Sequence, residues 1–373
     1  MAVNTVLLDF SIDPSLAKNE ASISILATNI ENVLKDFLSE LKLVNDFNFE
    51  GGLVKIYTAN SGSLLSLRIF INGLITLNID YFKEEKAEPL MNLDTCHQIE
   101  KVLKKRVSEI KRVQILPSLK RGDLIRYMPT SDERLLEYDI DKLVFEESTP
   151  FQKVQILHSK SMGNMLVLDD LQNIAESDLV YTETLMQRGK ENYANKEIVI
   201  LGGGDGALLY ELLKEKPKQV IMLEIDEVVM KACAKHMRSI CGDVLDQYER
   251  PNYKIIIGDC IKALEQYIKE GKKFDYVFGD LTDVPISENE SQEVWAFINN
   301  IISLSFKILK PSGKFMTHLT GGSSPEAIEA YLQYLKKMNP PVKFTQDRAF
   351  VPSFLEEWVF CQVSFADPAA IQE

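Results

Sequence analysis

Residues 198–206 place a carboxylate inside a glycine-rich turn of the kind that binds nucleotides; their sequence is Ile-Val-Ile-Leu-Gly-Gly-Gly-Asp-Gly. An apolar, β-branched run that ends in glycines and leads into residues 207–209 predicts a strand, a tight turn and a helix. Such a turn ordinarily attracts anions, because free N–H groups and the helix dipole point at it. Asp205 reverses that preference. The residue types therefore predict a nucleoside ligand that also carries a positive charge.

Acidic residues end or follow four apolar runs in this part of the chain. Asp205 follows the first run, Glu224 ends the second, Asp259 follows the third and Asp280 follows the fourth. In doubly wound sheets, ligands bind where the carboxyl ends of the parallel strands meet. We therefore expect the four carboxylates to form one constellation at that edge.

Glu224 has two interpretations. It lies nineteen residues after Asp205, which is the spacing of an acid that accepts hydrogen bonds from ribose hydroxyls. The alternative is an N-cap for the helix expected from Glu227, although Asp226 is better placed for that. We favour the ribose interpretation.

Asp259 and Asp280 also leave alternatives open. Asp259 is expected to accept a hydrogen bond from an adenine amino group or to cap a helix that begins at Ile261. The neighbouring Cys260 would then act through its backbone rather than as a reactive thiol. Asp280 precedes a proline-containing loop, Leu-Thr-Asp-Val-Pro-Ile, where a catalytic base would meet a substrate. A structural turn aspartate is the alternative.

The elements that must position these acids form an alternating pattern. Short apolar runs predict buried parallel strands, and amphipathic segments between them predict helices. This alternation predicts an α/β fold with an open, doubly wound sheet. The predicted strands are 198–201, 220–223, 254–257, 276–278, 342–345 and 358–364, and the predicted helices are 207–215, 227–237, 261–270 and one that begins at Ser324 and Pro325.

Residues 1–121 are expected to form an α+β domain devoted to dimerisation, because they contain no catalytic constellation. One helix is predicted at 29–41, with Val33, Phe37 and Leu41 on one face, and a second at 90–112, with Leu103, Val107 and Ile110 aligned. Asn72 and Gly73 predict a hairpin turn. Strands are predicted at 53–58, 63–71 and 74–79.

Pro117 and the pair Arg121-Gly122 predict a domain boundary. The following residues predict antiparallel strands at 135–145, 153–158 and 164–168, with a turn at Met162-Gly163. The predicted organisation is therefore an N-terminal domain of residues 1–121, a central β-domain of residues 122–174 and a catalytic domain of residues 175–373.

The composition excludes several classes of protein. A formal charge of -13 argues against a nucleic-acid partner, which requires a basic footprint, and is compatible with a polycationic substrate. No window of about 18 apolar residues predicts a membrane span, and the first residues do not form a secretory signal. The five scattered cysteines indicate reduced thiols in a cytoplasmic protein. The four histidines (His97, His158, His236 and His318) are isolated, so we expect them to be structural and expect no metal site.

Several motifs resemble those of the polyamine aminopropyltransferases. They are residues 202–206, 223–226, 258–260 and 280–286, together with the central segments 138–141, 156–160 and 175–179. The resemblance covers nearly the whole chain. It implies a Rossmann-like catalytic domain of the class I methyltransferase type. It also implies an N-terminal domain similar to S-adenosylmethionine decarboxylase that serves homodimerisation.

The resemblance further implies a role for each candidate site residue. Decarboxylated S-adenosylmethionine is the implied donor, as a co-substrate, and no metal or redox cofactor is implied. Asp280 would be the general base. The nucleoside of the donor would be held by Gln152, Glu224, Asp259 and Cys260, and the amine acceptor by Tyr181, Asp205, Phe354 and Glu356.

The implied chemistry suits these residue types. An amine is a nucleophile only when neutral, yet an alkylammonium has a pKa near 10. A carboxylate must therefore hold the cation first and accept its proton as the amine attacks the propyl carbon beside the sulfonium. Methylthioadenosine is then released.

The resemblance implies spermidine as the acceptor, with putrescine as the alternative. Phe354 stands where the family has a tyrosine that contacts the acceptor. Asp283 adds an acid that we expect more in the putrescine-using branch. A class I methyltransferase shares the sheet and the ribose acid, but its donor keeps a carboxylate that Asp205 would repel. A non-enzymatic binding protein is a further alternative, against which the four acids argue.

Overall fold

The computed structural model describes residues 2–84, 87–122, 124–281 and 292–371. Its contacts divide the chain into two compact units, residues 1–124 and 125–373. The three-domain division at residues 121 and 174 stays a prediction. In the described part of the chain, no helix combines the length and apolar character needed to cross a membrane.

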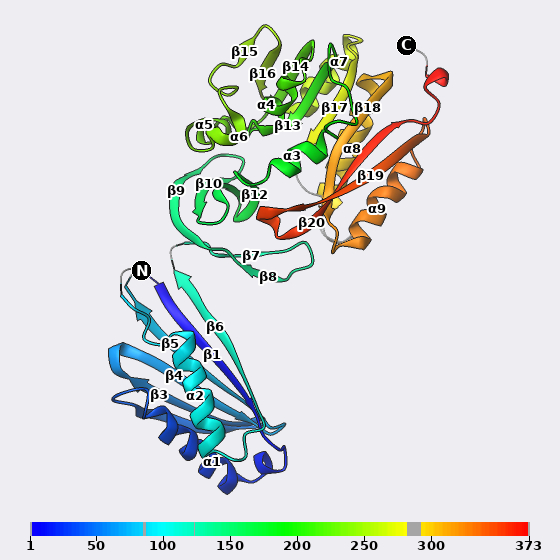
Figure 1. Ribbon diagram of the computed structural model, residues 1–373. Helices are drawn as coiled ribbons and strands as arrows, with labels where there is room; N and C mark the ends of the chain where they lie inside the picture. The colour runs from blue at the N-terminus through cyan, green and yellow to red at the C-terminus, as the bar shows by residue number, and fades with distance from the viewer. Residues whose placement is uncertain (1, 85–86, 123, 282–291, 372–373) are drawn as a thin grey trace. The chain divides into compact units, whose positions relative to one another are not determined.

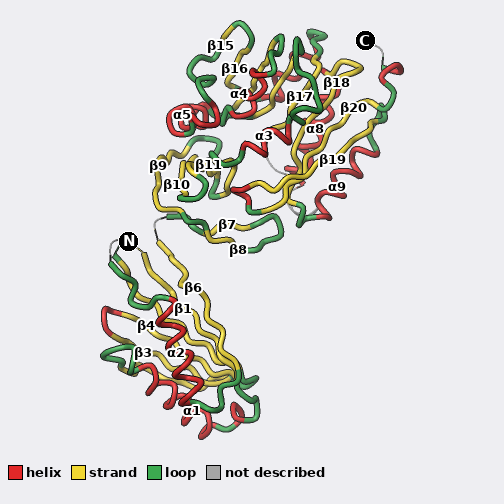
Figure 2. The backbone as a smooth tube through the Cα atoms, in the orientation of Figure 1, coloured by secondary structure: helices red, strands yellow, loops and turns green. Residues whose placement is uncertain are grey.

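The first unit is a six-stranded antiparallel sheet covered on one face by two helices, α1 (Glu20–Leu34) and α2 (Leu93–Arg106) (Figure 2). Alternate strand residues such as Leu67 and Leu77 are fully buried against the helices. The strand order is β2-β3-β4-β5-β1-β6. The bounds are β1 Ala2–Ser11, β2 Lys42–Phe49, β3 Gly52–Ala59, β4 Ser63–Phe70, β5 Leu74–Lys83 and β6 Arg112–Gly122.

Both helix predictions in this unit were wrong in their bounds. Helix α1 begins nine residues before the predicted start, because the side chain of Asn19 accepts hydrogen bonds from the amides of Ala21 and Ser22 and caps it there. It ends before Phe37, which packs against the core from outside the helix. Helix α2 also ends early, so Val107 and Ile110 are buried beyond it.

Pro117, one of the two marks of the predicted boundary, lies inside β6, whereas the contacts divide the chain after residue 124, close to the other mark, Arg121-Gly122. Strand β6 is an edge strand, and its pairing with β1 shifts register between Thr5 and Leu7, opposite the proline. An edge position with a register shift tolerates a residue that has no amide hydrogen. The hairpin turn at Gly73 is confirmed, since its amide donates to the carbonyl of Phe70 at 2.9 Å and its φ is 85°.

The second unit begins with small antiparallel sheets. A two-stranded hairpin pairs β7 (Tyr127–Pro129) with β8 (Leu135–Glu137). A four-stranded sheet follows in the order β12-β11-β10-β9. The strand predicted at 135–145 is in fact interrupted between β8 and β9, where buried Tyr138 donates a hydrogen bond to the carbonyl of Ser353 at 2.7 Å. The bounds are β9 Ile140–Ser148, β10 Lys153–Ser159, β11 Gly163–Leu168 and β12 Leu171–Ala175.

The second unit continues as an eight-stranded sheet in the order β15-β16-β14-β13-β17-β18-β20-β19. Strands β16, β14, β13, β17 and β18 are parallel, and β13 lies where the order of the strands reverses. The strand bounds are β13 Glu197–Gly202, β14 Gln219–Glu224, β15 Glu249–Arg250, β16 Tyr253–Ile257, β17 Phe274–Asp280, β18 Leu309–Gly321, β19 Val342–Val351 and β20 Glu356–Phe365. The doubly wound sheet is therefore confirmed.

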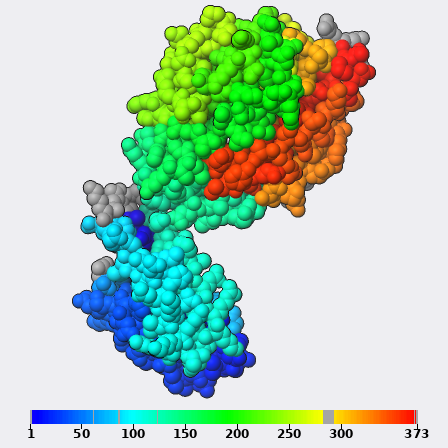
Figure 3. All heavy atoms as spheres, viewed as in Figure 1, coloured from blue at the N-terminus to red at the C-terminus, as the bar shows by residue number. Residues whose placement is uncertain are grey.

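Helices cover both faces of this sheet (Figure 1). Ile198 and Ile200 point into a core shared with α4 and α5, while Val199 and Leu201 point into a core shared with α7, α8 and α9. Helix α3 contacts β19, and in Figure 3 the orange-red surface of the last strands borders the green surface near α3. The helix bounds are α3 Leu179–Leu185, α4 Ala207–Lys214, α5 Glu227–His236, α6 Arg238–Cys241, α7 Cys260–Lys269, α8 Gln292–Ile308 and α9 Pro325–Lys336.

Candidate functional site

The glycine turn after β13 brings the backbone against two carboxylates. The amide of Gly203 donates to the main-chain carbonyl of Asp280 at 3.2 Å. A Cβ atom at Gly203 would lie 3.5 Å from Oδ2 of Asp280, and one at Gly204 would lie 2.7 Å from Oε2 of Glu224. Gly202, Gly203 and Gly206 have φ values of 82°, 77° and 79°, which favour glycine. The turn therefore joins the ends of three strands at the switch point of the sheet.

Asp205 is fixed within this turn. Its Oδ1 accepts a hydrogen bond from the amide of Ala207 at 2.8 Å, at the start of α4. A Cβ atom at Gly206 would lie about 3 Å from Cys241 and Leu245, so these side chains support the turn from beneath. Asp205 is therefore held by close packing of the following residue as well as by a hydrogen bond.

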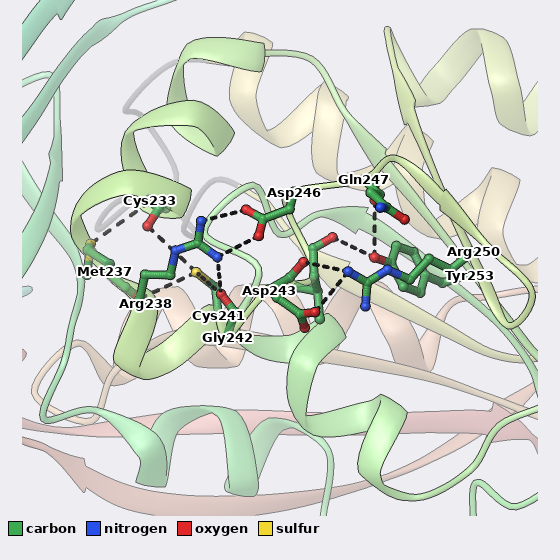
Figure 4. A network of polar contacts seen from close by, with 11 residues as sticks. Cys233, Met237, Arg238, Cys241, Gly242, Asp243, Asp246, Gln247, Arg250 and Tyr253 are labelled. Carbon is green, nitrogen blue, oxygen red and sulfur yellow. Dashed lines mark hydrogen bonds and ion pairs between the residues drawn. The ribbon is translucent and has the colours of Figure 1, made fainter.

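The segment of residues 238–253, which contains the supporting Cys241 and Leu245, is itself held by ion pairs and hydrogen bonds (Figure 4). Arg238 pairs with both oxygens of Asp246, at 2.8 and 2.7 Å, and Arg250 pairs with Asp243 at 2.9 Å. The hydroxyl of Tyr253 lies 3.1 Å from the carbonyl of Gln247. Exposed ion pairs stabilise a fold only slightly, so their main effect here is to fix the loop shape.

Asp205 and Glu224 are buried acids with few hydrogen bonds. Their exposed fractions are 8 % and 7 %, and Glu224 accepts a hydrogen bond from the amide of Asp226 at 2.8 Å. Burial raises the pKa of Asp205. Burial, reinforced by the charges of Asp205 and Asp226, raises the pKa of Glu224 to about 7. Within the described ranges neither acid forms an ion pair, so a bound cation would stabilise their charged forms.

Asp226 is different, because three donors satisfy it. It accepts from the amide of Val228 at 3.0 Å and so caps α5, as the sequence suggested. Its other oxygen accepts from Oγ1 of Thr149 at 2.8 Å and from Nε2 of Gln152 at 3.2 Å. Asp226 thus fastens the segment before β10 to the end of β14.

A groove of about 610 Å³ opens beside this junction. Phe151, Ile225 and Ile257 line it, with exposed fractions of 54 %, 42 % and 39 %. Apolar side chains around a few polar groups are typical of sites for small molecules. Asp259 also lines the groove, whereas Gln152 and Glu224 lie next to its lining residues.

Asp259 caps α7, which is one of the two interpretations considered. Its Oδ1 accepts from the amide of Ile261 at 2.9 Å, and no described residue donates a hydrogen bond to its second oxygen. Burial raises the pKa of Cys260 to about 11, so its thiol is predominantly protonated near neutral pH. This agrees with a backbone role for Cys260.

Asp280 ends β17 and contacts an aromatic cluster. The hydroxyl of Tyr181 donates to Oδ1 of half-buried Asp280 at 3.2 Å. The ring of Tyr181 packs edge-on against Phe354 and Phe360, with centroids 6.0 and 5.2 Å away. His318 lies 5.8 Å from the same ring, so this histidine borders the site. Such rings attract cations through their faces.

Phe354 and Glu356 flank a residue in an unusual conformation. Leu355 has a φ of 52° and a ψ of 32°, a left-handed conformation that costs a leucine roughly 1 kcal/mol. The bend ends a short helical turn and starts β20 at Glu356. Phe354 packs on Trp358, with centroids 4.4 Å apart. Local strain of this kind is common where a functional side chain must be aimed.

Glu356 is buried, with an exposed fraction of 5 %. Its carboxylate accepts hydrogen bonds from the amide and the hydroxyl of Ser131. No lysine, arginine or histidine among the residues that the structure describes forms an ion pair with it. Glu356 is therefore a third buried acid that lacks a cationic partner.

The structure brings the predicted residues together around the carboxyl edge of the sheet. Asp283, which the sequence analysis singled out, lies outside the described residues. The described residues contain no group of three or more metal-ligating side chains. All five cysteines are buried free thiols. Sequence reasoning missed Ser131, Thr149, Ile225 and Ile257; of these, only the apolar Ile225 between Glu224 and Asp226 carried a local signal.

Family models match most of the second unit. The model described as "Spermine/spermidine synthase domain" matches residues 178–370, and the one described as "Spermidine synthase tetramerisation domain" matches residues 126–176. The chain is 38% identical over 160 residues to a polyamine aminopropyltransferase of Sulfurisphaera tokodaii, covering 42% of this chain and 51% of that protein. It therefore spans about half the length of this relative.

Two further proteins match this chain over a larger share of their own length. The chain is 27% identical over 239 residues to a polyamine aminopropyltransferase of Pyrobaculum calidifontis, covering 62% of this chain and 79% of that protein. The spermidine synthase structure from Thermotoga maritima matches with a TM-score of 0.53 and 20% identity, covering 70% of this chain and 85% of that one. This structural likeness shows a shared Rossmann-like fold.

The contact between Gly204 and Glu224 gives a first prediction. Gly204→Ala would place a methyl group 2.7 Å from the Glu224 carboxylate, and overpacking of this kind costs about 1–3 kcal/mol. We expect affinity for methylthioadenosine to fall roughly 10-fold. Titration calorimetry measures this, with thermal unfolding as the control for an intact fold. Unchanged affinity would show that Glu224 does not contact the nucleoside.

The raised pKa of Glu224 gives a second prediction. Between its ordinary value of 4.5 and about 7, the folded chain binds more protons at Glu224 than the unfolded chain does. The contribution of Glu224 to the free energy of unfolding therefore falls as pH rises through this window, by on the order of 3 kcal/mol. Denaturant unfolding of Glu224→Gln should lack this fall, whereas Glu265→Gln, at an exposed site on α7, should keep it. Parallel pH profiles for wild type and Glu224→Gln would contradict the assignment.

Proposed function

Because this chain belongs to the spermine/spermidine synthase family, we propose that it is a polyamine aminopropyltransferase. It joins the aminopropyl group of decarboxylated S-adenosylmethionine to an amine and releases methylthioadenosine. The observation that carries the proposal is the set of buried acids Asp205, Glu224 and Glu356, which form no ion pair within the described parts of the chain. Both proposed substrates carry positive charge, so they supply cations for Asp205 and Glu356, while the ribose hydroxyls of the donor supply hydrogen-bond donors for Glu224.

The donor nucleoside occupies the groove at the end of β14. Ile225 and Ile257 provide apolar walls for the adenine, and the free oxygen of Asp259 accepts from its amino group. Glu224 accepts hydrogen bonds from the ribose hydroxyls. Gln152 acts through its hydrogen bond to Asp226, and Cys260 through its backbone.

The amine acceptor lies between Asp280 and the aromatic cluster. Asp205 and Asp280 bracket the reacting nitrogen, and the ring of Tyr181 packs beside it. Phe354 supplies a ring without a hydroxyl, so it contacts the methylene groups of the acceptor. Glu356 holds the far ammonium group.

The reaction is one displacement. Asp280 accepts a proton from the ammonium, and the nitrogen lone pair attacks the propyl carbon next to the sulfonium. The carbon–sulfur bond breaks, its electron pair stays on sulfur, and neutral methylthioadenosine leaves. Most of the rate enhancement comes from holding both substrates in line, since the residues named here position charge and form no covalent bond with the substrate.

We propose spermidine as the acceptor and spermine as the product, which makes the chain a spermine synthase. Glu356, a buried carboxylate two residues after Phe354, supports this choice, because a longer amine has a further ammonium group to place beside it. Putrescine is the alternative. The residue that favours it in the sequence, Asp283, is outside the described residues.

We also propose that residues 1–121 form a dimerisation domain similar to S-adenosylmethionine decarboxylase. This rests on the absence of a catalytic constellation in its sequence. The family model named for tetramerisation matches a different segment, residues 126–176, so contacts between subunits through that segment are a second possibility. Sedimentation of chains with and without residues 1–121 distinguishes the two: a shortened chain that remains dimeric would contradict the proposal.

The role of Asp280 gives a third prediction. Asp280→Asn should lower turnover roughly 10²-fold or more, because the amine loses its proton acceptor, while affinity for methylthioadenosine should change little. The measurement is methylthioadenosine release with spermidine, with putrescine and with no amine. Asp170→Asn, which removes the same charge at an exposed site, is the control. Full activity of Asp280→Asn would rule out its role as the base.

Asp205 gives a fourth prediction, which separates the aminopropyltransferase from a methyltransferase. Calorimetry should show tighter binding of decarboxylated S-adenosylmethionine than of the intact compound, because Asp205 repels the donor carboxylate. Asp205→Asn should reduce this preference. Tighter binding of intact S-adenosylmethionine by the wild type would defeat the proposed function.

A further inference from the structure

We propose that Ser131, at the tip of the β7–β8 hairpin, is a positioning residue that aims Glu356 at the far ammonium of the acceptor. It thereby determines which length of amine the site prefers. The inference rests on the proposed function and adds a specificity determinant from a segment outside the catalytic sheet. The chain of contacts runs from the hairpin tip to the start of β20, across 225 residues of sequence.

Ser131 engages both oxygens of the Glu356 carboxylate. Its amide donates to Oε2 at 3.2 Å, and its hydroxyl donates to Oε1. Two donors from one residue fix the plane of a carboxylate as well as its place. Each oxygen still has lone-pair capacity for a ligand. Ser131 therefore orients Glu356 without neutralising its charge.

Two neighbouring residues hold the hairpin tip at this position. The hydroxyl of Ser324, just before α9, donates to the carbonyl of Ser131 at 2.6 Å. Gly321 lies directly beneath, and a Cβ atom there would overlap both the Ser131 hydroxyl and the Glu356 carboxylate. The φ of Gly321 is not positive, so space rather than backbone conformation requires glycine here.

The tip is also rigid on its own. The amide of Thr130 donates to the carbonyl of Arg134 at 2.8 Å, and its hydroxyl donates to Asp132 at 2.6 Å. Nε of Arg134 pairs with both oxygens of Asp132 at 2.8 Å. A turn fixed by its own hydrogen bonds presents Ser131 in one orientation.

In the proposed function, Asp280 holds the reacting nitrogen and Glu356 holds the far ammonium group of the acceptor. Asp280 contacts the hydroxyl of Tyr181, the ring of Tyr181 packs against Phe354, and Glu356 follows Phe354 by two residues. Tyr181 and Phe354 thus link Asp280 to the chain segment that carries Glu356, and in the proposed function the acceptor extends along these rings from Asp280 to Glu356. Loss of the Ser131 hydroxyl should therefore weaken a long acceptor more than a short one.

The experiment compares Ser131→Ala with wild type for spermidine and putrescine. A hydrogen bond to a charged group is worth enough that its loss should raise KM for spermidine roughly 10-fold, with kcat within about 2-fold. KM for putrescine should stay unchanged. Gly321→Ala, which inserts a methyl group between Ser131 and Glu356, should act in the same direction. Calorimetric titration with spermidine should show the same loss of affinity without turnover.

The matched control is Ser15→Ala. Ser15, in the first unit, donates its amide and its hydroxyl to the carboxylate of Asp13 at 3.0 and 2.7 Å, so this variant removes the same kind of contact. It should leave both KM values unchanged. Equal KM changes for both amines in Ser131→Ala, or a lower unfolding temperature with wild-type KM values, would overturn the positioning role. If the wild-type chain released no methylthioadenosine with spermidine and none with putrescine, the proposed function would be overturned, and this inference with it.

Discussion

Three buried carboxylates that form no ion pair with any described residue impose the main constraint on the second unit. A charged group removed from water is costly unless a partner of opposite charge or several hydrogen bonds compensate it. Asp205 and Glu224 each receive little compensation, and their pKa values are raised as a result. The folded chain thus carries an unfavourable electrostatic term that a cationic ligand would remove. Removal of this term would contribute to the free energy of binding of such a ligand.

The fold distinguishes these acids from structural ones. Asp226 and Asp178 are as deeply buried, but donors satisfy them: Asp226 receives three hydrogen bonds, and Asp178 accepts from the amides of Ala175 and Ser353 at 2.7 and 3.0 Å. These two acids join the small β-sheets and the carboxyl-terminal turn to the large sheet. Burial raises the pKa of Asp178 as well, and its two amide donors equal in number the two donors on Glu356. The segments that the donors come from, rather than their number, therefore mark Asp226 and Asp178 as structural acids.

Much of the catalytic sheet was predictable, because parallel strands buried on both faces are continuous apolar runs. The predicted strands at 198–201, 220–223 and 254–257 lie within β13, β14 and β16, and the acids lie at or just beyond strand ends as expected. The first unit was less predictable. There the apolar period of Val33, Phe37 and Leu41 continued past the end of α1, since residues outside a helix also pack into a core. The contact between Ser131 and Glu356 had no sequence signal, because it depends on how distant segments pack.

Asp226 caps α5 and also binds the segment before β10, and this affects how a ligand can enter the groove. One oxygen of Asp226 caps α5, and the other accepts hydrogen bonds from Thr149 and Gln152. These two residues lie on either side of Phe151, just before β10. Outward movement of the segment that carries Phe151 would uncover an acid with an exposed fraction of 2 % and release the cap of a helix. We therefore expect a ligand to enter this groove without displacement of residues 149–152.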